Sequence, residues 1–238
     1  MTTTPYTFAS QVILVAGGTG GLGRAVSLAF LQAGATVLAT YRSAPELQAL
    51  QGAAGEHVAR LEGHAIDVLD EASLGRFMAD VLARHGRLDG LVNAVGGYAA
   101  GAPLWEMDAT ALDKMLAVNL RSGYCLARAV LPAMLAQRRG AIVNVAAMAA
   151  VNHLGAAAAY VASKAAAVAL IDSLAVDLKG TGVRANSILP SVIDTEANRK
   201  AMPGAAYASW PKPEEIAEVI LFLCSDSARL INGASIPV

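Results

Sequence analysis

The stretch "QVILVAGGTGGLGRA" (residues 11–25) carries the clearest indication of the fold in this sequence. Its first half is a short apolar run that ends in glycines, which is typical of a strand buried inside a parallel sheet. Residues 21–35 then show helical periodicity and stop at Gly34. A strand that passes through a glycine turn into a helix begins a strand–helix–strand unit, so this stretch predicts an α/β fold.

Of the glycines between the predicted strand and the predicted helix, Gly17, Gly21 and Gly23 form the spaced motif. Glycine permits a tight turn and lets the amides at the helix N-terminus approach a pyrophosphate, which the helix dipole favours. The alternative is a flexible turn without a ligand. The strand before the glycines and the helix after them favour a dinucleotide site.

The rest of the chain repeats the alternation of strand and helix. Strands are expected at 11–17, 36–40, within 59–68, and at 88–97, 140–147, 183–190 and near 234–238. Helices are expected at 21–35, 70–86, 108–137, around Tyr160 and at 212–225. Because no linker or repeat divides the sequence, we expect a single domain over residues 1–238. This pattern predicts a parallel sheet covered by helices on both faces.

The composition narrows the class of protein. Hydrophobic residues make up 55% of the 238 residues and charged residues 16%, so an oligomer interface is expected to bury part of the apolar surplus. The net charge of −1 provides no field for nucleic acid or an anionic membrane. Cys125 and Cys224 do not form a disulfide framework, which suits a reducing cytoplasm.

No targeting segment or metal motif is expected. The opening "MTTTPYTFASQ" lacks the basic and apolar regions of a secretory signal. We expect no apolar run of the roughly 18–20 residues that a membrane span needs. The four histidines and two cysteines have no metal-ligand spacing. The expected partners are therefore a small-molecule substrate and further copies of the chain, with no nucleic acid and no membrane.

The apolar stretch "AAAAYVASKAAAVAL" (156–170) carries Tyr160 and Lys164 four residues apart on one helix face. Residues at this spacing have Cβ atoms about 5–6 Å apart. The ordinary pKa of tyrosine, about 10, is too high for efficient acid–base catalysis at neutral pH. A neighbouring cation is expected to lower this pKa. The alternative is a core tyrosine beside a solvated lysine.

The whole chain resembles the short-chain dehydrogenase/reductase family. The resemblance rests on the glycine spacing, on "YVASK", and on further matches in the same order along the chain. These are "IDV" at 66–68, "NAVGG" at 93–97, "VNL" at 118–120, "IVNV" at 142–145 and "LPSVIDT" at 189–195. The resemblance implies a doubly wound Rossmann-type sheet of about seven strands, a nicotinamide cofactor, and a homodimer or homotetramer.

The resemblance also assigns roles to residues. Tyr160 would pass a proton to the substrate, Lys164 would hold the nicotinamide ribose, and Asn119 would support a proton-relay water. The cofactor would be bound by Gly17, Thr19, Gly21, Leu22, Gly23, Arg42, Asp67, Val68, Asn93, Ala94, Tyr160, Lys164, Pro190, Ile193 and Thr195. Structural alternatives remain for three of them: a turn residue at Asp67, a strand-stabilising amide at Asn93 and a core amide at Asn119.

Arg42 bears on which cofactor is used. Members that use NAD have an acid near the end of the second strand, whereas "LATYRS" has Tyr41, then Arg42, and no carboxylate before Glu46. An arginine pairs with a 2′-phosphate in a bidentate manner. We therefore expect NADP to be preferred and NAD to be accepted as well. The alternative is a solvated surface arginine.

One position departs from the family. Thirteen residues before Tyr160, where a catalytic serine is usual, the chain has Ala147. A lost donor of this type costs about 2.7–4 kcal/mol in the transition state. His153 is one candidate replacement and Tyr98 is a candidate for stacking on a flat substrate; the alternatives are a solvated histidine and a hydrophobic lid.

The stretches at 189–210 and 95–101 resemble dihydropteridine reductase, a branch of the family that also has alanine at the serine position. The leading expectation is therefore a reductase of an activated acceptor, such as a quinonoid or pterin-like C=N, an enone or a carbonyl. The alternatives are an ordinary carbonyl reductase or alcohol dehydrogenase with another donor, or a cofactor-binding relative with little turnover.

Overall fold

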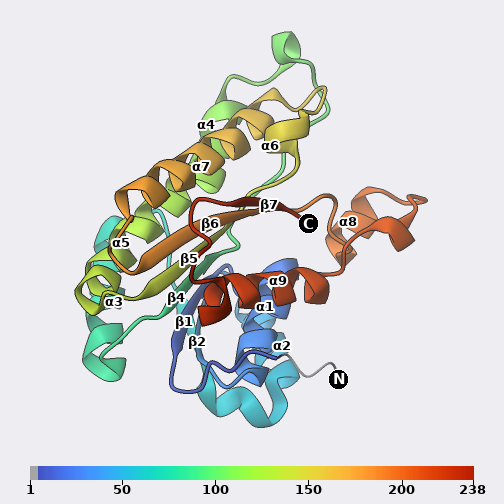
Figure 1. Ribbon diagram of the computed structural model, residues 1–238. Helices are drawn as coiled ribbons and strands as arrows, with labels where there is room; N and C mark the ends of the chain where they lie inside the picture. The colour runs from blue at the N-terminus through green and yellow to red at the C-terminus, as the bar shows by residue number, and fades with distance from the viewer. Residues whose placement is uncertain (1–4) are drawn as a thin grey trace.

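The computed structural model describes residues 5–238 and contains one seven-stranded parallel sheet (Figure 1). Its strand order is β3-β2-β1-β4-β5-β6-β7, so the order reverses between β1 and β4. The strands are β1 (Val12–Ala16), β2 (Thr36–Tyr41), β3 (Leu61–Ala65), β4 (Gly90–Asn93), β5 (Gly140–Val145), β6 (Val183–Leu189) and β7 (Ser235–Pro237). The predicted doubly wound α/β sheet is confirmed.

Helices cover both faces of the sheet (Figure 1). One face carries α1 (Gly21–Gln32), α2 (Ala44–Ala54) and α9 (Pro213–Cys224), and α1 packs against α9. The other face carries α3 (Glu71–His85), α4 (Thr110–Leu116), α5 (Ser122–Gln137) and α7 (Ala158–Asp177). Shorter elements are α6 (Ala149–Asn152), α8 (Glu196–Ala201), a π-helical turn at Ala117–Arg121, and 3-10 turns at Gly55–Arg60, Leu104–Glu106, Tyr207–Ser209 and Asp226–Ala228.

The sequence of strand β1 is apolar throughout because the strand is buried on both faces of the sheet. Ile13 and Val15 point into the core beneath α1 and α9, while Leu14 and Ala16 point into the core beneath α3 and α5. Successive side chains of a strand face opposite sides of the sheet, and here both sides are covered. Continuous burial of the strand therefore requires a continuous apolar run.

Two helical regions differ from expectation. The prediction omitted α2, whose sequence has one large buried side chain, Leu50, and therefore no strong apolar stripe. The predicted helix at 108–137 is divided by the π-helical turn that contains Asn119. Turns of this kind occur often at functional sites.

Helix α7 also corrects the expectation about membrane spans. It is 20 residues long, and by length and composition alone it is apolar enough to cross a membrane. In the fold it packs against β6, α4 and α6. Its buried apolar side chains, such as Ala167 and Ile171, therefore serve contacts within the fold, while Val176 remains exposed.

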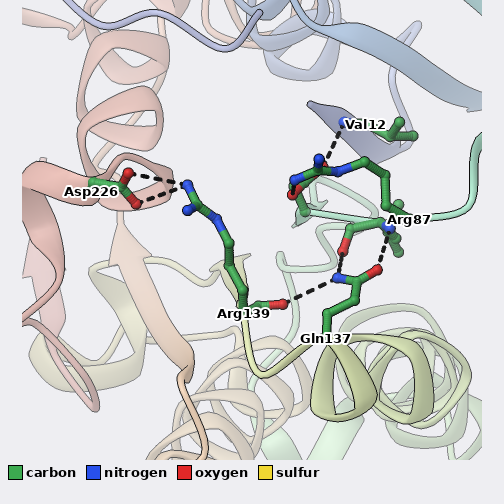
Figure 2. Close-up of polar contacts among 7 residues, drawn as sticks. Val12, Arg87, Gln137, Arg139 and Asp226 are labelled. Atoms are coloured by element: carbon green, nitrogen blue, oxygen red, sulfur yellow. Dashed lines mark hydrogen bonds and ion pairs between the residues drawn. The ribbon is translucent and has the colours of Figure 1, made fainter. Parts of the chain in front are cut away.

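A polar network ties together the N-terminal ends of the central strands (Figure 2). The buried carboxylate of Asp89 accepts a hydrogen bond from the Val12 amide at 2.9 Å and a bidentate pair from Arg87. The Gln137 side chain bonds both main-chain groups of Leu88, at 2.9 Å and 2.8 Å. These contacts fix the beginnings of β1, β4 and β5 relative to one another, and hence the position of their opposite ends.

Candidate active site

The glycine turn after β1 is held at the carboxyl end of the sheet, where the strand order reverses. The Gly17 amide donates to Thr40 Oγ1 at 2.9 Å, and the Gly18 amide donates to the Thr40 carbonyl at 3.1 Å. A Cβ at Gly23 would lie 2.0 Å from the Gly17 carbonyl oxygen. Only glycine at this position lets α1 begin directly against the turn.

The N-terminus of α1 is suited to an anion. Its N-cap, Gly20, makes no side-chain capping hydrogen bond, and its first turn contains no acidic residue. The first amides of a helix have no partner within the helix, and the helix dipole adds positive potential there. A phosphate group of a dinucleotide fits this donor set.

A cavity of about 210 Å³ lies beside this turn. Six of the predicted cofactor-binding residues line it: Gly17, Thr19, Arg42, Asp67, Val68 and Ala94. Asp67 also accepts a hydrogen bond from the Leu69 amide at 2.9 Å, so it serves the turn as well as the cavity wall. The carboxyl ends of β1, β2, β3 and β4 thus meet around one space, as in doubly wound sheets that bind dinucleotides.

The cavity contains an acid that the sequence analysis did not include in the site. Glu46, in the first turn of α2, lines the cavity with Arg42 and accepts a hydrogen bond from Thr19 Oγ1 at 3.0 Å. Prediction of α2 from the sequence would have placed Glu46 one turn after the end of β2. A cation and an anion therefore share this wall, which leaves the preference for NADP as a prediction.

The remaining predicted cofactor residues lie outside the cavity lining. Leu22 is buried, and a Cβ at Gly21 would lie 2.9 Å from the Thr195 methyl, so the α1 turn packs closely on the 190–195 loop. The Pro190 carbonyl accepts a hydrogen bond from the Met148 amide at 2.9 Å, and Ile193 packs against the core. Asn93 is buried and donates to Asn144 Oδ1 at 2.9 Å, which matches the structural alternative for this residue.

Lys164 and Asn119 converge next to the cavity at Gly96. A Cβ on Gly96, which lines the cavity, would lie 3.1 Å from Asn119 Oδ1 and 3.2 Å from Lys164 Nζ. Lys164 is buried and donates to the Val145 carbonyl at 3.0 Å. Burial lowers the pKa of Lys164 to about 8. Lys164 was predicted as a site residue from the sequence. The close approach of Lys164 and Asn119 to Gly96 depends on the fold and could not be predicted in this way.

The buried side chain of Asn119 forms hydrogen bonds to two separate segments. Its side chain accepts the Gly97 amide at 2.9 Å, and its Nδ2 donates to the Gly97 carbonyl and to Ser163 Oγ, each at 3.0 Å. Ser163 in turn donates to the Tyr160 carbonyl at 2.7 Å. The amide thus connects the loop after β4 to α7.

Tyr160 lies at the start of α7, half-buried, with Tyr98 against its ring. Burial, and secondarily the neighbouring Tyr98, raises the pKa of Tyr160 above its ordinary value. This direction is opposite to the one expected from a nearby lysine. The physical reason is that Lys164 directs Nζ to a backbone carbonyl, while loss of solvent penalises the tyrosinate.

The predicted substrate-side residues differ in their surroundings. Ala147 is buried and, with Ala146, presents no hydroxyl near Tyr160. His153 is exposed, has a φ of 51°, and makes no hydrogen bond within residues 5–238. Across the same described part of the chain, no three His, Cys, Asp or Glu side chains are grouped to hold a metal ion.

Comparison with known proteins gives a consistent result. Residues 11–205 match the family described as short chain dehydrogenase. The chain is 37% identical over 237 residues to D-threitol dehydrogenase of Mycolicibacterium smegmatis, covering 96% of this chain and 91% of that protein. It is 31% identical over 236 residues to a 3-oxoacyl-(acyl-carrier-protein) reductase of Thermotoga maritima, covering 96% of each.

A solved structure of NAD+-bound xylitol dehydrogenase superposes with a TM-score of 0.89 at 25% identity, covering 97% of this chain and 98% of that chain. These similarities bear on the family and the fold, and they do not address the resemblance to dihydropteridine reductase.

Proposed function

Because this chain belongs to the short-chain dehydrogenase family, in which it is an NAD(P)-dependent oxidoreductase, we propose that it interconverts a small carbonyl compound and its alcohol. One observation carries the proposal: Lys164 and Asn119 meet at Gly96, on the wall of the cavity beside the glycine turn. Two of the residues proposed to assist Tyr160 therefore lie beside the proposed dinucleotide site. The names of the relatives, a threitol dehydrogenase and an oxoacyl reductase, support the same class of substrate.

The residues of the chain fit a nicotinamide dinucleotide. The free amides of α1 suit its pyrophosphate, and Lys164, beside Gly96, is placed to bind the nicotinamide ribose. When bound in reduced form, the cofactor supplies the hydride that adds to the carbonyl carbon. NADP is the proposed preference because Arg42 lines the cavity, and Glu46 on the same wall favours some use of NAD.

Tyr160 supplies the proton in this mechanism. Its raised pKa keeps the phenol protonated at neutral pH, as an acid needs before it protonates the alkoxide that forms on the carbonyl oxygen. Lys164 holds the nicotinamide ribose in this mechanism, and the field of its cation at the tyrosinate is too weak to offset burial before the reaction. Asn119 holds Gly97 and Ser163 in place around both groups. In the reverse direction the tyrosinate accepts the proton of the alcohol.

A second candidate function follows from Ala147. No hydroxyl occupies this position, so no serine donates a hydrogen bond to the substrate oxygen from there. A plain ketone needs such a donor more than an acceptor that takes hydride readily, such as a quinonoid or pterin-like C=N or an enone. The site would therefore suit the second kind of acceptor. The stretches at 189–210 and 95–101 that resemble dihydropteridine reductase favour the same acceptors.

We also propose that the protein works in the cytoplasm as a homodimer or homotetramer. Exposed apolar side chains occur on α5 and α7, at Tyr124, Leu135 and Val176. A second copy packed on these helices would cover them. The two free cysteines agree with a reducing compartment.

The testing experiment is a panel of diacetyl, a simple ketone, an enone, a quinone and quinonoid dihydropterin, each assayed with NADPH and with NADH. The wild-type protein is expected to reduce diacetyl, and Tyr160→Phe is expected to lower kcat by at least about a hundredfold while leaving cofactor binding intact. Turnover confined to quinone and dihydropterin would favour the second candidate. Equal rates for the wild type and Tyr160→Phe would refute the mechanism.

A further inference from the structure

The proposed catalytic centre has Tyr160 as its proton donor, and Ala147 occupies the position where a second donor is usual in the family. Hydride addition places negative charge on the carbonyl oxygen, and a fixed hydrogen bond to that oxygen speeds the reaction strongly. Ala146 and Ala147 have no polar side-chain atom. The hydroxyl of Ser163 is occupied, because it donates to the Tyr160 carbonyl and accepts from Asn119.

Tyr98 brings a free phenol to the same place. Its ring lies at 77° to the ring of Tyr160, and the centroids are 4.8 Å apart. The side chain is 66% exposed, and its hydroxyl makes no hydrogen bond within residues 5–238. A phenol in contact with the proton donor and without an internal partner is available to a bound substrate.

The loop that carries Tyr98 is fixed on both sides of it. Asn119 binds the amide and the carbonyl of Gly97, at 2.9 Å and 3.0 Å. The Gly101 amide donates to the Ala156 carbonyl at 2.9 Å, just before α7 begins. Both anchors connect the loop to the segments that hold Asn119 and Tyr160. The backbone on both sides of Tyr98 is therefore held beside the start of α7, which keeps the ring of Tyr98 next to the ring of Tyr160.

We propose that the Tyr98 hydroxyl donates the second hydrogen bond to the substrate oxygen and so does the work of the serine that Ala147 replaces. This inference rests on the proposed function, because it concerns carbonyl reduction by Tyr160. During the reaction the carbonyl carbon receives the hydride, its oxygen receives the proton of Tyr160, and Tyr98 keeps its own proton.

The decisive variants are Tyr98→Phe, Ala147→Ser and the double variant, assayed by diacetyl reduction with NADPH. Tyr98→Phe keeps the ring and removes only the hydroxyl, so kcat is expected to fall about a hundredfold while the acceptor KM changes less than about threefold. Ala147→Ser alone is expected to change kcat less than about threefold, because a donor is already present. In the double variant the new serine is expected to restore at least about tenfold of the lost rate.

Other outcomes overturn the inference. Full kcat in Tyr98→Phe would show that the ring is only a wall of the site, and a loss that serine does not rescue would assign Tyr98 to loop packing. NADPH affinity and the melting temperature serve as controls and are expected to be unchanged in Tyr98→Phe. If the wild type is active and Tyr160→Phe is inactive, either result removes only the role of Tyr98. No turnover by the wild type would remove the proposed function as well.

Discussion

Lys164 donates a hydrogen bond from its buried Nζ to the main-chain oxygen of Val145 at 3.0 Å, at the carboxyl end of β5. The contact holds the ammonium at the carboxyl end of the sheet, where the proposed active site lies. One hydrogen bond to a neutral carbonyl does not compensate for the hydration that the ammonium loses on burial. Burial therefore lowers the pKa of Lys164 from 10.5 to about 8. The ammonium is half deprotonated at about pH 8, so the cation is fully formed only well below that value and is lost as the pH rises through it.

This titration predicts the pH dependence of reduction. With Tyr160 protonated throughout, kcat/KM for NADPH at saturating acceptor reports the free enzyme. It is expected to be level below about pH 8 and to fall about tenfold per pH unit above it, as Lys164 loses its charge. In Lys164→Arg the cation persists, so the decline is expected at higher pH. A decline near pH 8 that survives in Lys164→Arg would contradict the assignment.

Arg42 and Glu46 on one cavity wall predict opposite shifts in cofactor preference. Arg42→Asp is expected to move the NADPH/NADH ratio of kcat/KM toward NADH, because it removes the partner for a 2′-phosphate and adds a like charge. Glu46→Gln is expected to move the ratio toward NADPH by about tenfold, or about 1.4 kcal/mol. Glu56→Gln, at an exposed acid outside this cavity, is the matched control. An unchanged ratio in both cavity variants would remove the wall from cofactor selection.

Gly23 is predicted to tolerate no side chain. In Gly23→Ala the new Cβ would lie 2.0 Å from the Gly17 carbonyl oxygen, so the turn must shift away from α1. The expected cost is about 1–3 kcal/mol in the free energy of unfolding, with weaker NADPH binding. Gly52→Ala is the control, since a Cβ there meets nothing within 4 Å and alanine favours the helix α2. Equal stability of the two variants in urea unfolding would contradict the packing argument.

The polar network in Figure 2 predicts unequal costs for two arginines. Arg87→Ala leaves the carboxylate of Asp89, whose side chain is 2% exposed, without its cation, at an expected cost of about 1–3 kcal/mol. Arg139→Ala removes a pair in which the Asp226 side chain is 80% exposed, at about 0–1 kcal/mol. Urea unfolding of the two variants measures the difference. Equal losses would mean that burial of Asp89 does not decide the energy.

Much of the active site was predictable because it follows local rules. The glycine turn needs only a strand before it and a helix after it, and Tyr160 and Lys164 share a face because residues four apart on a helix always do. The approach of Lys164 to Asn119 at Gly96 depends on the packing of α7 against the loop after β4. Asn119 was predicted as catalytic only through the family resemblance, whereas the spacing from Tyr160 already indicated a role for Lys164.

The parallel α/β sheet and the glycine turn could be read from the amino-acid pattern, since apolar runs that alternate with helices permit few arrangements. The electrostatic environment of each site residue, and the residues around it, depend on how distant segments pack. The tertiary structure buried Tyr160, which raises the pKa of this residue, directed Lys164 to the Val145 carbonyl, and brought Glu46 to the wall beside Arg42. It also placed Tyr98 against Tyr160. Desolvation and contacts between distant segments arise only when the chain is packed, and no local pattern encodes them.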